Sequence, residues 1–360
     1  DSLPTGNPLH QHILLLPQGA PAGVFDLLSG EVHASGLTAL QDVSRQLQDS
    51  ALGALRNRLG AGLAPGAPTA QAGGAPDASS LPQSRALPLW VDFVGRKRQV
   101  DGDANTATAD HSQSALFLGA TMETANRWSV GVTAGFTDSR VDLDARRSSA
   151  RIQSMSLALA AGKRFETSWG GLNVLGGIAH SSHELETKRE IAPTGLAQTL
   201  EADRNARALD VFGEVGLVLP VNTSLTAEPF LNIGWTQITQ SAFQERGGSA
   251  ALTGARQRSD STSSTLGLRM QQKLGNGGVL NASLGWRHAS GDVRGTANLS
   301  FAGSQPFTVA GAAVARSGAV LQVGAQFNLS TNTSLGLAYG AQFGGGGRDH
   351  GGKVTFSWKL

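Results

Sequence analysis

The sequence predicts an all-β transmembrane protein, a 12-stranded antiparallel up-and-down β-barrel with an N-terminal α-helix inside the pore. Three observations predict it. From Leu87 to Leu360, apolar residues recur at every second position in twelve segments, as they do in strands with one lipid-facing and one polar side. The connections between these segments alternate between short and long. One amphipathic helix precedes them.

The composition fits this class and excludes others. Glycine accounts for 47 of 360 residues, 16% of residues are charged and 40% are hydrophobic, a balance unlike that of a disordered chain. No apolar run approaches the roughly 20 residues of a spanning helix. The net charge of +2 is spread without a basic stripe, so nucleic acid is not an expected partner. The absence of cysteine excludes disulfides and thiolate chemistry.

The first segment, residues 1–35, is apolar and interrupted by prolines. We expect short helices over Pro8–Leu16 and Pro21–Ser29 and no independent core. The chain starts at Asp1 without an initiator methionine or signal peptide. We therefore interpret residues 1–35 as the remnant of an upstream passenger and its junction, in a C-terminal piece of a longer protein.

Residues 36–60 form the predicted pore-spanning helix, with Ser35 as N-cap and Gly60 as the C-terminal stop. Its apolar face contains Leu37, Leu40, Val43, Leu47, Ala51, Leu52 and Leu55. About 22 helical residues at 1.5 Å each span roughly 33 Å, about the thickness of a membrane. The opposite face of this helix is nevertheless too polar to contact lipid. Residues 61–86, rich in Ala, Gly, Pro and Ser, are predicted to be a linker.

Residues 87–360 form the predicted barrel. Its strands begin near Leu87, His111, Trp128, Ala150, Gly171, Glu201, Ser224, Ser259, Val279, Arg316, Thr333 and Gly351. Short turns such as Glu123–Arg127 alternate with long polar connections such as Asp138–Ser149 and Lys188–Leu200. In a membrane barrel, short turns face the periplasm and long loops face outward.

A 12-stranded barrel encloses a lumen wider than its own side chains fill, and a polar-faced helix would plug it. The predicted pore-helix residues are Arg45, Asp49, Arg56 and Arg58, and the predicted lumen-facing residues are Asp92, Glu214, Glu228, Arg269 and Arg287. We expect Arg45, Arg56 and Arg58 to pair with acids such as Asp92, Glu214 and Glu228. The chain would then run inward through the pore, leaving the N-terminal region at the cell surface.

Several stretches together resemble the C-terminal translocator domain of monomeric autotransporters, the type V secretion proteins. The resemblance covers the whole chain. It is carried by Leu28–Ser35, Leu89–Gly95, Asp101–Asp103, Trp128–Phe136, Phe212–Gly216, Glu228–Phe230, Ser264–Arg269, Gly285–Asp292, Phe307–Gly311 and Asp349–Gly351. It implies insertion in the bacterial outer membrane and export of the chain's own passenger to the surface.

The resemblance also implies partners. They are outer-membrane lipid and lipopolysaccharide, periplasmic chaperones, the passenger, and the barrel-assembly machinery, and the protein would be a monomer. The assembly machinery reads a C-terminal strand that ends in an aromatic residue in this family. The corresponding residues here are Val354, Phe356, Trp358 and Leu360, so this chain ends in leucine and has its tryptophan two residues earlier.

The sequence offers little catalytic chemistry, and we expect no cofactor and no metal. Some family members cleave themselves inside the barrel through an asparagine. The candidate here is Asn57, but the paired asparagines of one self-cleaving group are absent, which favours an ordinary helix-end position. His180 and His183 would point to opposite faces of a strand, so they would not share a metal.

Two other functions use the same barrel. A diffusive outer-membrane porin or channel would have no use for the upstream helix. An outer-membrane enzyme would need a site at the loop rim, for which the available histidines are His111, His180, His183, His288 and His350.

Overall fold

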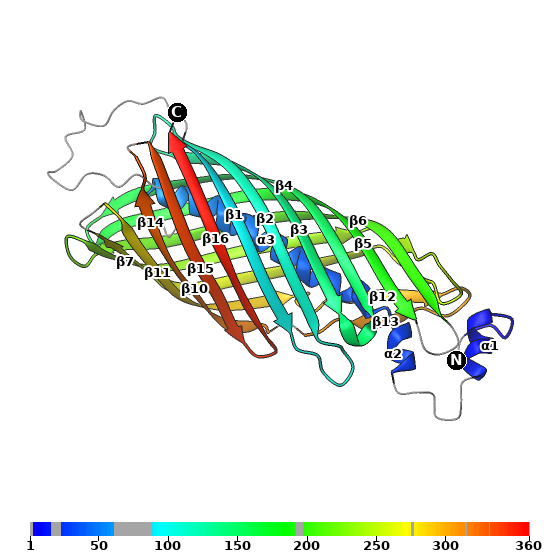
Figure 1. Ribbon diagram of the computed structural model, residues 1–360. Helices are drawn as coiled ribbons and strands as arrows, with labels where there is room; N and C mark the ends of the chain where they lie inside the picture. The colour runs from blue at the N-terminus through cyan, green and yellow to red at the C-terminus, as the bar shows by residue number, and fades with distance from the viewer. Residues whose placement is uncertain are drawn as a thin grey trace.

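The computed structural model describes residues 3–15, 23–60, 88–191, 197–274, 277–313, 315–330 and 332–359. Within them, twelve antiparallel strands close into a barrel, because β1 pairs with β2 on one side and with β16 on the other. Figure 1 shows the steeply tilted strands wrapped around one long helix. The predicted fold class is confirmed. The predicted linker 61–86 lies outside the described residues.

The barrel strands are long and joined in chain order. Their bounds are β1 Pro88–Val100, β2 Ala109–Glu123, β3 Ser129–Leu143, β4 Ser148–Thr167, β5 Gly170–Ile191, β6 Gln198–Pro220, β7 Leu225–Gln240, β10 Gln257–Lys273, β11 Val279–Gly291, β14 Ser317–Asn328, β15 Thr333–Gly344 and β16 Gly347–Lys359. Every neighbouring pair is antiparallel.

The period-two pattern assigns the two faces of the strands correctly. On β3, Val132 and Phe136 point outward and are 41% and 46% exposed, whereas the residues that follow each of them, Thr133 and Thr137, are buried in the lumen. Apolar residues such as Leu284 and Trp286 on β11 cover the outside of the barrel in the same way. Such exposed apolar side chains are the expected lipid-facing surface of a membrane barrel.

Two connections expected to be long polar loops are mostly strand. β3 continues to Leu143 and β4 begins at Ser148, with only a 3-10 turn, η1 (Asp144–Arg146), between them. β5 likewise continues to Ile191. The alternation continues beyond the apolar band, but the outward positions become charged, as at Asp138 and Glu184. The charged outward residues give these segments a loop-like composition, although the backbone of each segment still forms the hydrogen bonds of a β-strand.

Two of the remaining long loops, between β7 and β10 and between β11 and β14, form a second sheet at the same end of the barrel. Its strands are β8 (Phe243–Gln244), β9 (Leu252–Gly254), β12 (Thr296–Phe301) and β13 (Phe307–Ala310), in the order β13-β12-β9-β8. Figure 1 shows β12 and β13 near the start of the long helix. The two loops are far apart in sequence, so their pairing was not predicted.

In the described residues that precede the barrel, the chain forms three helices. They are α1 (Pro8–Leu14), α2 (Val24–Leu28) and α3 (Glu31–Arg58). The predicted start of the long helix is wrong, because α3 begins five residues before Gly36 and Ser35 lies inside it. Gly30 precedes it with a left-handed φ of 72°, a conformation that glycine adopts without steric cost. In the described part of the chain, no helix is both long enough and apolar enough to cross a membrane.

Candidate functional site: the helix inside the lumen

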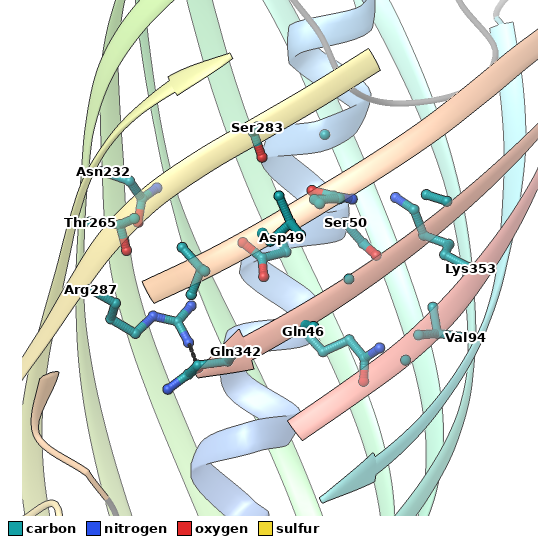
Figure 2. Close-up of a pocket in the computed structure, with 18 of the residues that line it drawn as sticks. Gln46, Asp49, Ser50, Val94, Asn232, Thr265, Ser283, Arg287, Gln342 and Lys353 are labelled. Atoms are coloured by element: carbon teal, nitrogen blue, oxygen red, sulfur yellow. Dashed lines mark hydrogen bonds between the residues drawn. The ribbon is translucent and has the colours of Figure 1, made fainter. Parts of the chain in front are cut away.

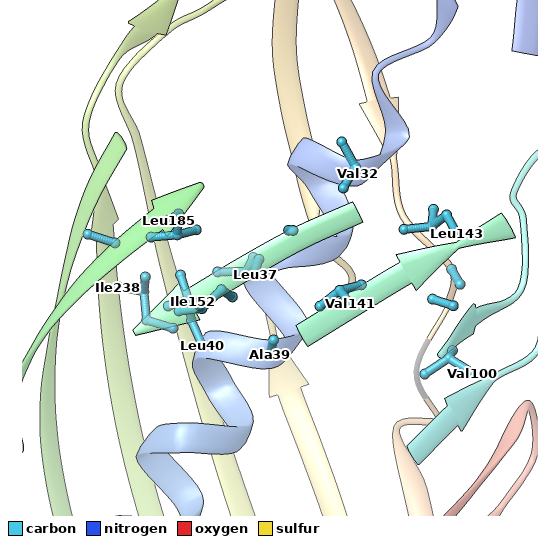
Figure 3. Packing of buried hydrophobic residues seen from close by; sticks show 14 of the residues in the cluster. Val32, Leu37, Ala39, Leu40, Val100, Val141, Leu143, Ile152, Leu185 and Ile238 are labelled. Atoms are coloured by element: carbon cyan, nitrogen blue, oxygen red, sulfur yellow. The ribbon is translucent and has the colours of Figure 1, made fainter. Parts of the chain in front are cut away.

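The long helix α3 lies against one wall of the barrel and not on its axis. It contacts β2 to β7, with its most extensive contacts to β3, β4 and β5. Figure 3 shows Leu37 and Leu40 of the helix packed beside Val141, Ile152 and Leu185 of this wall. All seven predicted apolar positions of the helix are at most 3% exposed. The apolar stripe therefore determines which wall the helix faces.

A buried ion-pair group joins the last turns of α3 to the barrel. Arg56 donates to Glu214 of β6 through Nε and Nη2, at 2.7 and 2.6 Å. Arg269 of β10 donates to the same carboxylate at 2.7 Å and lies 3.4 Å from Glu228 of β7. The Arg269 guanidinium also lies 3.6 Å from the centroid of the Phe230 ring. The predicted pairing of Arg56 with Glu214 is therefore present.

Two further polar groups lie along the helix. Asp92 of β1 accepts a hydrogen bond from Ser50 of α3 at 3.1 Å and another from Thr355 of β16, with Lys353 at 3.5 Å. Nearer the start of the helix, Asp42 accepts from Arg98 of β1 at 2.8 and 2.9 Å. These contacts hold α3 at more than one level of the barrel.

Two predicted pairings are wrong. Arg45 binds Asp42 on its own helix, because the i,i+3 spacing places the two side chains on one face. Arg58 lies 4.0 Å from Glu123 at the end of β2, since the last turn of the helix reaches the short-turn rim. Neither of these two arginines therefore forms an ion pair with Asp92.

Opposite the contacted wall, a cavity of about 230 Å³ separates α3 from β10, β11, β14, β15, β16 and β1. Figure 2 shows Asp49 and Ser50 on the helix side and Arg287 and Lys353 on the barrel side. Asp49 is exposed even though it lies midway along an enclosed helix. Arg287 donates to Gln342 at 2.9 Å. The volume and polar lining suit on the order of ten water molecules, so the helix fills only part of the lumen.

A second buried group holds the start of α3 and was not predicted. Arg189 of β5 donates to Glu245, beyond β8, through two bonds of 2.7 Å. The His33 Nε2 of α3 lies 2.7 Å from the same carboxylate. Burial alone would raise the pKa of the Glu245 carboxyl, but these partners outweigh it and lower the pKa to about 2. Glu31 also accepts from the Ala107 backbone N–H at 2.9 Å.

The other candidates are placed as follows. Asn57 is partly buried in the last turn of α3, where its carbonyl accepts from the Gly60 N–H at 3.2 Å. His180 is exposed, whereas His183 is buried and bonded to Ser154 at 2.8 Å, so they do face opposite ways. Val354 and Phe356 point outward on β16 with Trp358, whose ring lies 5.5 Å from that of Phe356. Leu360 lies outside the described residues.

Comparison with known proteins agrees with this architecture. The family model "Autotransporter beta-domain" matches residues 89–340. An "Extracellular serine protease" of Serratia marcescens is 29% identical over 337 residues, which cover 92% of this chain and 30% of that protein. The chain thus spans about a third of the length of the curated relative it matches.

Solved structures share the fold. The translocator domain of the autotransporter NalP from Neisseria meningitidis superposes with a TM-score of 0.68 at 16% identity, over 92% of this chain and all of that one. The transport unit of AIDA-I from Escherichia coli gives 0.59 at 14% identity, over 79% and 93%. With the family model matching most of the chain, this chain belongs to the autotransporter β-domain family and is an outer-membrane translocator domain that exports a passenger.

Proposed function

We propose that α3 is the last part of the exported segment, retained in the pore after the passenger has passed, with the residues that precede α3 left at the cell surface. The observation that carries this proposal is the direction of α3. The helix starts among the long loops, beside β12 and β13, and ends at the short-turn rim near Glu123. Its 28 residues extend about 42 Å, more than the hydrocarbon thickness of about 30 Å.

The absence of cysteine provides a direct test of this orientation. Leu14 in α1 is 70% exposed at the long-loop end, and Trp169 in the short β4–β5 turn is 79% exposed. We expect a membrane-impermeant maleimide to label Leu14→Cys on intact cells and to label Trp169→Cys only after lysis. Labelling of Trp169→Cys alone on intact cells, or equal labelling of both, would contradict the proposed orientation.

We propose that the passenger upstream of this chain is a serine protease. The support is the Serratia marcescens relative, whose name states that activity and of which this chain matches about a third. The test is hydrolytic activity in the medium or at the surface of cells that express the whole protein, before and after treatment with a serine-directed inhibitor. Secretion of a passenger without such activity would contradict this assignment.

For assembly we propose that periplasmic chaperones deliver the unfolded chain and that the barrel-assembly machinery binds β16. The outward apolar residues Val354, Phe356 and Trp358, together with Leu360, would form the recognised surface. The barrel would function as a monomer and be surrounded by lipopolysaccharide in the outer leaflet. Replacing Phe356 with Ser should reduce the amount of inserted barrel, measured as heat-modifiable protein in outer-membrane fractions, whereas Ser357→Ala, on the opposite face, should not.

We propose that Asn57 has no catalytic role and that the passenger is not released by cleavage next to it. The helical hydrogen bond accepted by its carbonyl favours this assignment, because self-cleavage requires the side chain to attack its own main chain. Mass spectrometry of the barrel isolated from cells gives the test. An N-terminus adjacent to Asn57, lost in Asn57→Ala, would show the opposite.

A further inference from the structure

The outward face of the barrel changes character along β16 and β1, which lie side by side with β15 in Figure 1. Taken toward the long-loop end, the cross-strand pairs on this face are Phe93 with Val354, Gly95 with Gly352, and Lys97 with His350. The first pair is apolar and lipid-facing, the second has no side chains, and the third is basic. Over these three consecutive cross-strand pairs, the outward surface therefore changes from apolar side chains, to glycines without side chains, to basic side chains.

The glycine pair leaves a shallow depression in the surface. A Cβ added at Gly95 would meet no atom within 4 Å, and one at Gly352 would meet only the Ala338 carbonyl oxygen, at 3.9 Å. Tyr339 of β15 lies beside Gly352 and is 52% exposed. Glycine inside a strand often marks a site where a ligand approaches the backbone closely, and tyrosine is enriched at the level of lipid headgroups.

The cations above the depression lack acidic partners. Lys97 and Arg348 are exposed and form no ion pair with any residue that the structure describes. Arg348 lies opposite Gln99, two positions from Lys97 on the same face, a diagonal separation of about 7–8 Å. Asp110, the acid of this face on β2, already accepts a bond from Gln99 at 3.1 Å.

The cross-strand row that contains Lys97 continues onto β3 and β4, where its basic residues are paired with acids. Arg140 is bonded to Asp142 at 2.8 Å, and Arg151 to Asp138 at 2.6 Å. On β5 and β6 the row continues with the acidic pair Glu186 and Asp203. Of the basic residues of this row on β1, β3, β4 and β16, those without an ion pair therefore lie at the seam where the last strand meets the first.

We propose that Lys97, Arg348 and His350, with the depression at Gly95 and Gly352, bind the phosphate groups of lipopolysaccharide in the outer leaflet. The cations would hold the phosphates, and an acyl chain would lie over the glycines against Phe93 and Val354. Arginine and lysine are the side chains that bind phosphate most strongly. This inference rests on the proposed orientation, because only the long-loop end of the barrel meets lipopolysaccharide.

The test uses the whole chain in detergent micelles and measures binding of bis-phosphorylated lipid A by native mass spectrometry. The double variant Lys97→Gln/Arg348→Gln should bind lipid A about tenfold more weakly or worse, because two charge-assisted contacts are lost. The control Arg140→Gln/Arg151→Gln removes the same charge from the same row and should change binding by less than about twofold. Equal binding by the double variant and the original protein would overturn the proposal.

A second variant tests the depression. The Cβ of Gly95→Val would lie in open space, so this variant should weaken lipid A binding while the heat-modifiable mobility of the barrel stays unchanged. Lipid A without its phosphates should bind the original protein no better than it binds the double variant. Excess inorganic phosphate should compete poorly with lipid A, because inorganic phosphate lacks the acyl chains. Tight binding of the dephosphorylated lipid would contradict the role of the cations.

These variants leave the export route intact. The surface labelling of Leu14→Cys should persist in the Lys97→Gln/Arg348→Gln background. Loss of lipid A binding with normal labelling would support the lipid site, whereas reversed labelling in the original protein would refute the orientation itself.

Discussion

Arg56 of the pore helix and Glu214 of β6 form a doubly hydrogen-bonded ion pair inside the lumen. Glu214 also accepts from Arg269, so one carboxylate serves two guanidinium groups on different elements. This carboxylate joins the last turns of α3 to the barrel wall.

Removing this carboxylate should cost more than removing either arginine. We expect Glu214→Gln to lower the free energy of unfolding by about 3 kcal/mol or more, because two buried cations lose their shared partner. Arg56→Gln leaves Glu214 paired with Arg269 and should cost about 2 kcal/mol. Urea unfolding followed by tryptophan fluorescence measures both. A larger loss for Arg56→Gln would contradict this arrangement.

The helix should limit the conductance of the barrel. The cavity beside Asp49 is polar and suits water, but α3 occupies the rest of the lumen. In planar bilayers the intact chain should therefore show a small conductance, and deletion of residues 31–58 should increase it severalfold. A large conductance that does not change on deletion would favour a diffusive porin.

The loop sheet should loosen at low pH. The pKa of Glu245 is about 2 in the folded protein, below its ordinary value of 4.5, because Arg189 and His33 bind the carboxylate. The stabilisation is fully present above pH 4.5 and is lost as the pH falls toward 2. Hydrogen exchange of residues 243–254, corrected for its intrinsic pH dependence, should rise in that range.

The variant Glu245→Gln provides the control for this pH dependence. It should exchange faster already at neutral pH, because Arg189 loses its charged partner, and it should show no further step between pH 4.5 and 2. A step that persists in this variant would assign the pH dependence to another group.

The turn before α3 should tolerate only glycine. Gly30 has a φ of 72°, and an added Cβ would lie 2.5 Å from a methyl of Leu252 and 2.9 Å from one of Leu299. Gly23 has a similar φ of 87° but open space around it. Both substitutions to alanine should cost about 1–2 kcal/mol from the left-handed backbone.

Gly30→Ala should destabilise further, because the Cβ also displaces the leucines of β9 and β12. Limited proteolysis of the loop sheet, at sites within residues 243–254 and 296–310, measures the difference. Equal susceptibility of Gly30→Ala and Gly23→Ala would show that the sheet does not pack on this turn.

Local periodicity explains which predictions held. Alternation in β3 assigned Phe136 to the lipid side and Thr133 to the lumen, because successive side chains of a strand point to opposite faces. The helical spacing of Leu37, Leu40 and Leu47 similarly identified the buried stripe of α3. These properties depend on neighbouring residues and can be recognised from the sequence without knowing the rest of the fold.

The errors in the helix have both distant and local causes. The helix begins at Glu31 and not at Gly36 because the Glu31 carboxylate is held by the Ala107 N–H and by Arg146, 2.9 Å away. Arg45 binds Asp42 because the i,i+3 spacing places both side chains on one face of the helix. The partners of Glu31 are far from it in the sequence, so no local pattern could indicate them, whereas the spacing of Arg45 and Asp42 is itself local.

By itself, the sequence determined the number of strands, their lipid-facing sides, the presence of one pore helix and its apolar stripe, since each follows from periodic burial along a continuous segment. Only the tertiary structure decided which wall the helix contacts, that a polar cavity remains beside Asp49, and that Glu214 and Glu245 bind the two ends of the helix. The physical reason is that these features depend on how side chains from separate strands fill a closed lumen. That filling is determined by barrel closure, which brings β1 and β16 together from opposite ends of the domain.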